Sequence, residues 1–146
     1  MRSFVARFAE EALVFAEMKG ILLLADSATA HPDGTVSMLR MGITRLWVQP
    51  KTPGPFAFRG SLIARITGDL GDAGQHNFDL KCLDEDGEEV APAIAGSVNL
   101  AKEGGEANLI VNMAVALPRI GKYVFVIRVD NFQLDSYDFR VSELSH

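Results

Sequence analysis

The sequence predicts a single all-β domain in which about eight strands pack as two antiparallel sheets. The chain has 146 residues, a length that single domains commonly have. Apolar and polar residues alternate in runs that Gly, Asp and Pro turns separate, at intervals of about 10–15 residues. No helical pattern lies between these runs, so parallel strand–helix–strand units are excluded.

Residues 1–18 form a separate leading segment, and the predicted β-sandwich domain spans residues 19–146. A helical period places the apolar side chains of the leading segment on one face, and these include Phe4, Phe8 and Phe15. We expect a short amphipathic helix that docks on the domain. Packing of this stripe on a partner or on a second copy stays open, as does a natural start at Met18.

The first predicted strand, residues 21–25, is wholly apolar, which is typical of a strand that is buried on both faces. A turn follows at residues 31–35, where an Asp-Gly pair favours the positive φ of a tight turn. Residues 38–48 predict one strand with a break near Gly42. Three prolines make residues 49–55 a stiff loop, because proline has no backbone donor.

The clearest alternation runs over residues 56–67. Its aromatic and aliphatic side chains predict an inward face, while Arg59 and Arg65 fall on the outward face. Residues 78–82 alternate in the same way. Residues 84–88 carry the Asp-Gly signal of a hairpin turn, which separates this run from the next one.

Four more runs complete the predicted sheets, at residues 93–100, 109–117, 123–129 and 132–141. Asp130 and Asn131 between the last two runs predict a two-residue turn. The alternation shifts by one residue at Asp135 and Ser136, which is the effect of a β-bulge within a strand. Strands with one apolar and one polar face pack as two sheets around a shared core.

Several stretches carry a family resemblance: residues 21–28 with 32–35 and 43–47, residues 83–87, and residues 123–130. Together they resemble small bacterial proteins that are grouped as a family of unknown function. The resemblance covers residues 19–142 and leaves the leading segment out. It implies an immunoglobulin-like β-sandwich, and it brings no activity, cofactor or catalytic residue to this chain.

Composition limits the class of protein. The chain has 14 Lys and Arg against 19 Asp and Glu, and a net charge of −5 argues against a protein that grips nucleic-acid phosphates. The longest nearly uncharged apolar run, residues 20–25, falls far short of the roughly 20 residues that cross a bilayer. We expect a cytoplasmic protein with no nucleic-acid partner and no membrane partner.

Catalytic and metal-binding motifs are missing from the sequence, so we expect a protein that is not an enzyme and uses no cofactor or metal. His31 and His76 fall in or beside loops, and His146 ends the chain, with no metal-ligand spacing among them. Cys82 shares an apolar face, which predicts a buried and unreactive thiol. The carboxylates of residues 84–88 offer oxygen ligands to calcium, but a hairpin turn requires the same residues.

The candidate interaction surface combines aromatic side chains with outward arginines: Trp47, Phe4, Phe8, Phe15, Arg59 and Arg65. Trp47 ends a predicted strand beside the proline loop, where its ring either stacks on a partner or closes the edge of the core. Arg40 and Arg45 belong to the predicted strand before the one that carries Arg59 and Arg65. Arginines in this arrangement are more often ordinary solvent-facing residues, and the alternative is that they bind an anion or an acidic partner.

We therefore predict a non-catalytic binding or assembly module that acts through contacts with an unknown protein partner or a second copy. The open edges of a sandwich favour this function, because unprotected edge strands pair with other chains. One alternative is a small-ligand binder or enzyme that uses Arg and carboxylate residues assembled only by the fold. Another is a structural subunit of a phage-like or secretion assembly, which rests on fold analogy.

Overall fold

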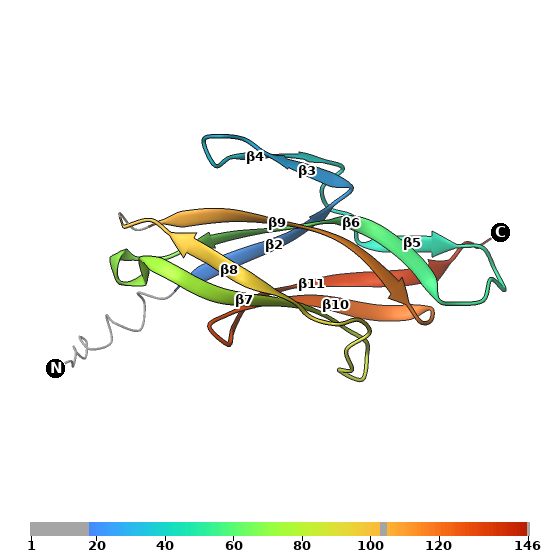
Figure 1. Ribbon diagram of the computed structural model, residues 1–146. Coiled ribbons are helices and arrows are strands. Elements are labelled where there is room, and N and C mark those ends of the chain that lie inside the picture. The colour runs from blue at the N-terminus through green and yellow to red at the C-terminus, as the bar shows by residue number, and fades with distance from the viewer. Residues whose placement is uncertain (1–17, 103–104, 146) are drawn as a thin grey trace.

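Two β-sheets make up the body of the protein, one of three strands and one of five. The computed structural model describes residues 18–102 and 105–145, so the predicted helix, with Phe4, Phe8 and Phe15, lies outside the described residues. Figure 1 shows the two sheets as two layers. The prediction of an all-β domain is confirmed.

The three-stranded sheet has the order β2-β6-β9, and both of its pairings are antiparallel. Along β6 the aromatic and aliphatic side chains are buried while Arg59 and Arg65 are exposed, as the alternation predicts. The strands of this sheet are β2 (Lys19–Ala25), β6 (Phe56–Thr67) and β9 (Glu106–Leu117).

The five-stranded sheet has the order β5-β11-β10-β7-β8. At its edge β5 pairs with β11 in parallel, so the prediction of purely antiparallel sheets is wrong there. The two strands are far apart in the sequence, and no local pattern specifies their pairing. The strands are β5 (Arg45–Val48), β7 (Gly74–Leu83), β8 (Ile94–Leu100), β10 (Gly121–Val129) and β11 (Phe132–Glu143), with a short 3-10 turn η1 (Leu70–Asp72) before β7.

A two-stranded hairpin of β3 (Ser27–Ala30) and β4 (Val36–Leu39) stands above the outer face of the three-stranded sheet (Figure 1). The predicted break near Gly42 is confirmed, but the two segments that it separates are not one strand, because β4 belongs to the hairpin and β5 to the five-stranded sheet. Arg40 and Gly42 take φ values of 57° and 98°, and this left-handed backbone redirects the chain from the hairpin to β5 in the other sheet.

The hairpin lies against the sheet below it, because β3 contacts β6 and β9. The side-chain amide of Asn108 on β9 also donates to the carbonyl of Gly34 in the hairpin turn at 2.8 Å. This cover explains why Ser61 and Ile63 are buried although they occupy outward positions of β6.

The core lies between the two sheets and joins them. The rings of Phe58 on β6 and Phe139 on β11 lie 4.7 Å apart, and Phe125 of β10 lies 5.9 Å from Phe139. Aromatic pairs at these separations add to the hydrophobic burial. Cys82 is buried in the same core, where burial raises the pKa of its thiol to about 12, so its predicted core position is confirmed.

The turn and the bulge near the end of the chain also agree with the sequence. Asp130 and Asn131 connect β10 to β11 with φ values of 51° and 71°, as the predicted two-residue turn requires. In the pairing of β10 with β11 the register skips Leu134. The bulge therefore lies just before the predicted position at Asp135 and Ser136.

Candidate functional site

The arginines that the sequence places on neighbouring strands do not form one site. Arg45 lies on β5 in the five-stranded sheet, whereas Arg59 and Arg65 lie on β6 in the three-stranded sheet. Arg40 occupies the bend between the hairpin and β5. This placement does not support a shared anion site of the four side chains, because β5 and β6 belong to different sheets, and it agrees with the alternative of ordinary solvent-facing arginines.

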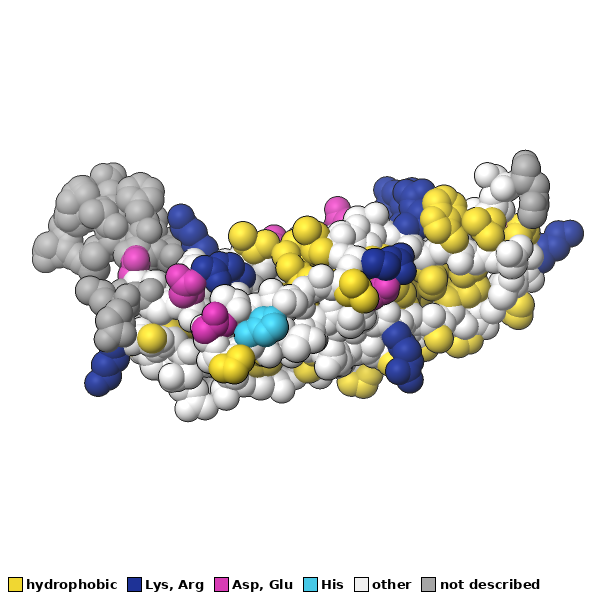
Figure 2. Space-filling view, turned by 90° about the horizontal axis from the view of Figure 1, so that it is seen from above, with side chains coloured by type: hydrophobic (Ala, Val, Ile, Leu, Met, Phe, Trp, Pro, Cys, Tyr) yellow, Lys and Arg dark blue, Asp and Glu magenta, His cyan; other side chains and the backbone are white. Residues whose placement is uncertain are grey.

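Two of these arginines have carboxylate partners. Arg40 donates to Asp26 at 2.8 Å, and Arg65 pairs with Glu106. Figure 2 looks onto this side of the molecule, where acidic and basic side chains lie intermixed over the left half. Exposed pairs of this kind contribute little to stability, and they neutralise the charge that a ligand would need.

A different group of cations lies on the outer face of the five-stranded sheet. Lys122 of β10 is directly opposite Arg140 of β11, and Arg140 is directly opposite Arg45 of β5. We call Lys122, Arg140 and Arg45 the basic row. Among the described residues, no carboxylate forms an ion pair with any member of the row. Directly opposite like charges destabilise a sheet, so the row has a cost in the free protein.

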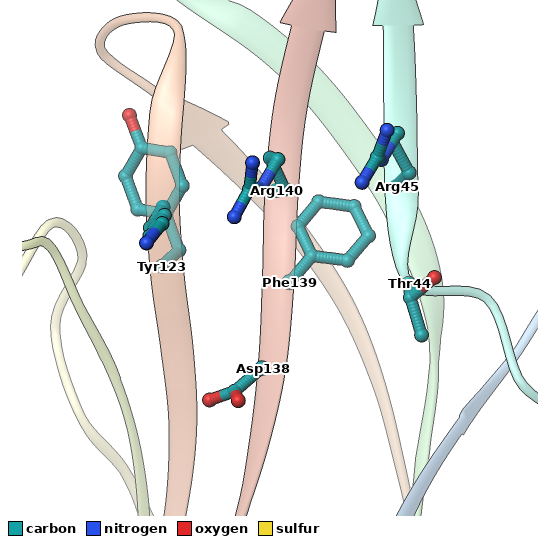
Figure 3. A pocket seen from close by; sticks show the side chains of 7 residues that line it. Thr44, Arg45, Tyr123, Asp138, Phe139 and Arg140 are labelled. Atoms are coloured by element: carbon teal, nitrogen blue, oxygen red, sulfur yellow. The ribbon is translucent and has the colours of Figure 1, made fainter.

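The basic row borders a shallow hollow of about 340 Å³ on this face. Figure 3 shows Arg45 and Arg140 on neighbouring strands, with Asp138 further along β11. Asp138 is the one carboxylate in the lining. The hollow is lined by Thr44, Arg45, Lys122, Tyr123, Asp138, Phe139 and Arg140.

Trp47 lies beside the basic row. It is 50% exposed and directly opposite Ser142 of β11, so its ring does not close the core. The guanidinium carbon of Arg45 lies 5.1 Å from the centre of the Trp47 ring, a distance at which a cation and an aromatic face attract. Within the described residues β5 has β11 as its one strand neighbour. An apolar ring and a free strand edge therefore adjoin three cations.

Arg128 provides a contrast on the same face. Its guanidinium donates to both carboxylate oxygens of Asp79, at 3.0 and 2.9 Å. These hydrogen bonds raise the pKa of Arg128, and a bidentate pair of this kind leaves the fork already occupied. Arg128 is thus neutralised in place, unlike the basic row.

In the acidic turn after β7, the carboxylate of Asp84 accepts hydrogen bonds from the turn itself. Asp84 accepts hydrogen bonds from the backbone of Glu88 and Asp86, and Arg119 donates to it at 3.0 Å. These contacts, the Glu88 bond first, hold the pKa of Asp84 below its usual range. No group of three or more His, Cys, Asp and Glu able to hold a metal occurs in residues 18–102 and 105–145. The backbone hydrogen bonds to the Asp84 carboxylate are those of a tight turn, as the hairpin interpretation predicts.

His76 is not the solvated loop histidine that the sequence indicates, because it lies within β7 with its side chain 15% exposed. Its Nδ1 is 2.6 Å from a carboxylate oxygen of Asp130, and its Nε2 is 2.6 Å from the carbonyl of Asp72. Both partners accept, so the doubly protonated ring satisfies both. The Asp130 bond, followed by the Asp72 carbonyl, raises the pKa of His76 and in turn lowers that of Asp130.

Comparison with known proteins gives a family and no activity. No curated protein matches the chain. The alkylpurine DNA glycosylase AlkC of Pseudomonas fluorescens, bound to DNA containing an abasic site analogue, is similar with 12% identity and a TM-score of 0.46. That match covers 91% of this chain but only 32% of the glycosylase chain. A protein assigned as a lipoprotein from Bacillus anthracis has 12% identity and a TM-score of 0.32, over 62% of this chain and 68% of that one.

Structural likeness at these TM-scores says nothing about the function of this chain. Among the described residues, no helix is long and apolar enough to cross a bilayer. The family resemblance seen in the sequence is confirmed, because one family model matches residues 20–142. The chain belongs to that family, DUF6941, which is a family of unknown function.

Proposed function

We propose that the protein is a non-catalytic binding module, and that the basic row with Trp47 binds an acidic segment of a protein partner. The observation that carries this proposal is the row itself: three cations on adjacent strands without a carboxylate partner among the described residues. Such a row lowers the stability of the free protein, and sites that lower stability are typical of function.

The chemistry of the row fits carboxylates. Arginine presents a planar fork that donates to both oxygens of a carboxylate, and lysine adds a point charge. Adjacent strands lie about 4.8 Å apart, so the row spans about 10 Å. In an extended segment the side chains of one face recur about every 6.6 Å. Two acidic residues of such a segment therefore reach the row, and Trp47 offers an apolar contact beside them.

An extended partner fits the face better than a small molecule does. Small-molecule sites enclose most of the ligand in a concave pocket, whereas this hollow lies on the outward face of a sheet. A small-ligand binder that uses the Arg and carboxylate side chains of the hollow is the alternative.

We also propose that the two sheets form an immunoglobulin-like sandwich. Support comes from Tyr123 at the start of β10, whose hydroxyl donates to the carbonyl of Arg119 four residues earlier. A tyrosine of this kind is a hallmark of immunoglobulin-like domains. A cytoplasmic location and a structural role in a phage-like or secretion assembly stay predictions.

The binding proposal is tested by fluorescence anisotropy with a labelled polyglutamate peptide. Arg140→Glu reverses the centre of the row, and Arg59→Glu is the matched control, because Arg59 is an exposed arginine on the other sheet. We expect Arg140→Glu to weaken binding at least about tenfold, a change of about 1.4 kcal/mol. Arg59→Glu should stay within about twofold, or about 0.4 kcal/mol. Equal losses in the two variants would contradict the proposal.

Inorganic phosphate serves as a competitor in the same assay. We expect it to displace the peptide only at far higher concentration, because one small anion contacts less of the row. Displacement at similar concentrations would favour the small-ligand alternative and overturn binding of an acidic segment. Circular dichroism of each variant establishes that it is folded.

A further inference from the structure

A second hollow, of about 890 Å³, lies where the described chain begins. Its lining includes Phe132, which at 73% exposure is the most exposed large apolar side chain of the described residues, and Ile21, which is 54% exposed. Met18 and Leu134 also line it and pack against the core. Apolar side chains that gather in a hollow rimmed by polar residues mark a contact site, unlike apolar side chains scattered singly.

We propose that residues 1–17 of this chain occupy this hollow with the apolar stripe that contains Phe4, Phe8 and Phe15. Met18, the first described residue, itself lines the hollow, so the preceding residues start at its rim. Phe15 stands three residues earlier and therefore lies within about 11 Å of Met18 even in an extended chain. A directly attached segment also has an effective concentration of about the millimolar range. This inference concerns a surface separate from the basic row.

The rim of the hollow matches a segment with one apolar and one charged face. Lys19 supplies positive charge at the rim and Asp72 supplies negative charge, whereas Arg65 and Asp130 at the same rim are already paired with Glu106 and His76. In the sequence the leading segment carries both signs off its apolar stripe, at Arg2, Arg7, Glu10, Glu11 and Glu17. A second copy or another protein would offer similar chemistry without the advantage of the covalent connection.

A disulfide experiment on the full chain tests the assignment. Ala12→Cys adds a thiol on the stripe, and Gln133→Cys adds one in the lining of the hollow, so both substitutions spare the aromatic side chains. Cys82 does not compete, because it is buried and its thiol pKa is raised to about 12. The matched control carries the same cysteine pair with Phe8→Asp and Phe15→Asp, which keep the connection but remove the apolar stripe.

We expect an intramolecular disulfide that forms at least about tenfold faster in the pair with the intact stripe than in the control. Mass spectrometry without reductant measures its formation at several protein concentrations. Equal rates in the two backgrounds, or no cross-link in either, would overturn the proposal. Disulfide-linked dimers whose rate rises with protein concentration would assign the hollow to a second copy and would overturn it as well.

Discussion

The outer faces of the two sheets carry cations in opposite electrostatic settings. On the three-stranded sheet Arg65 pairs with Glu106, and the hairpin covers the centre of the face. On the five-stranded sheet the basic row has no ion pair among the described residues, although Arg128 on the same face is neutralised by Asp79. The number of arginines therefore does not mark a binding face. The binding face that we propose is distinguished instead by its cross-strand register and by the absence of ion pairs to the row among the described residues.

We expect the largest effect from a core substitution that removes a contact between the two sheets. Phe139 lies between Asp138 and Arg140 on β11, is 2% exposed, and contacts Phe58 of the other sheet. We expect Phe139→Ala to lower the free energy of unfolding by about 3–5 kcal/mol, because it leaves a cavity between the sheets. Urea unfolding followed by Trp47 emission and by circular dichroism should give coincident transitions. Two separate transitions would mean that the sheets are stabilised independently.

Tyr123→Phe tests the hydrogen bonds at the start of β10, the strand that carries Lys122 of the basic row. The Tyr123 hydroxyl donates to the Arg119 carbonyl and accepts from the Arg119 amide. Removing the hydroxyl leaves the part-buried amide and carbonyl of Arg119 without this hydrogen-bond partner. We therefore expect a loss of about 1–2 kcal/mol in the free energy of unfolding. An unchanged urea midpoint would show that the hydroxyl does not fix the start of β10.

A pH titration distinguishes the His76–Asp130 pair of the five-stranded sheet from the basic row. The folded pKa of His76 is raised above its usual 6.5, so its stabilisation is complete below 6.5 and is lost as the pH rises through the raised value. Asp130 acts in the other direction, because its lowered pKa gives stability that is lost only when the pH falls below 3.8. The effect is modest, since Asp130 is 47% exposed.

The urea midpoint should therefore decline as the pH rises above 6.5. His76→Gln should remove that decline, and peptide binding should stay constant over the same range because no histidine lines the basic row. A flat profile of the unsubstituted protein would contradict the assigned role of His76.

The smallest effects have opposite signs on the two faces. Arg140→Gln removes like-charge repulsion with Lys122 and Arg45, so we expect it to raise the free energy of unfolding by about 0.2–0.5 kcal/mol. Arg65→Gln removes an exposed ion pair, and we expect a loss of about 0.2–1 kcal/mol. Thermal unfolding at low ionic strength measures both. Changes of the same sign would remove the electrostatic distinction between the faces.

The sequence could predict which residues face outward, because alternation decides the face of a strand. Lys122 and Arg140 alternate with the apolar residues Tyr123 and Phe139. The same alternation therefore predicts that Lys122 and Arg140 are exposed, as they are in the structure. The basic row itself cannot be predicted from alternation, because it also includes Arg45. The parallel pairing of β5 with β11 brings Arg45 into register, and it depends on a crossing between sheets that no local pattern specifies.

The contact between His76 and Asp130 could not be predicted from the sequence for the same reason. The turn residues Asp130 and Asn131 predict the β10–β11 hairpin by their local conformational preferences. The contact between Asp130 and His76 joins residues 54 positions apart, and it is created when β10 pairs with β7. Sequence patterns specify elements and turns, whereas contacts between strands distant in sequence follow from the assembled sheet.

Trp47 emission reports directly on binding at the basic row, because Trp47 is the single tryptophan of the chain and its ring centre lies 5.1 Å from the Arg45 guanidinium carbon. We expect a saturable change in emission on titration with a polyglutamate peptide. The midpoint should move to higher peptide concentration as salt is added, and Arg140→Glu should abolish the change. Emission that stays constant while anisotropy reports a bound peptide would place the acidic segment elsewhere and contradict binding at the basic row.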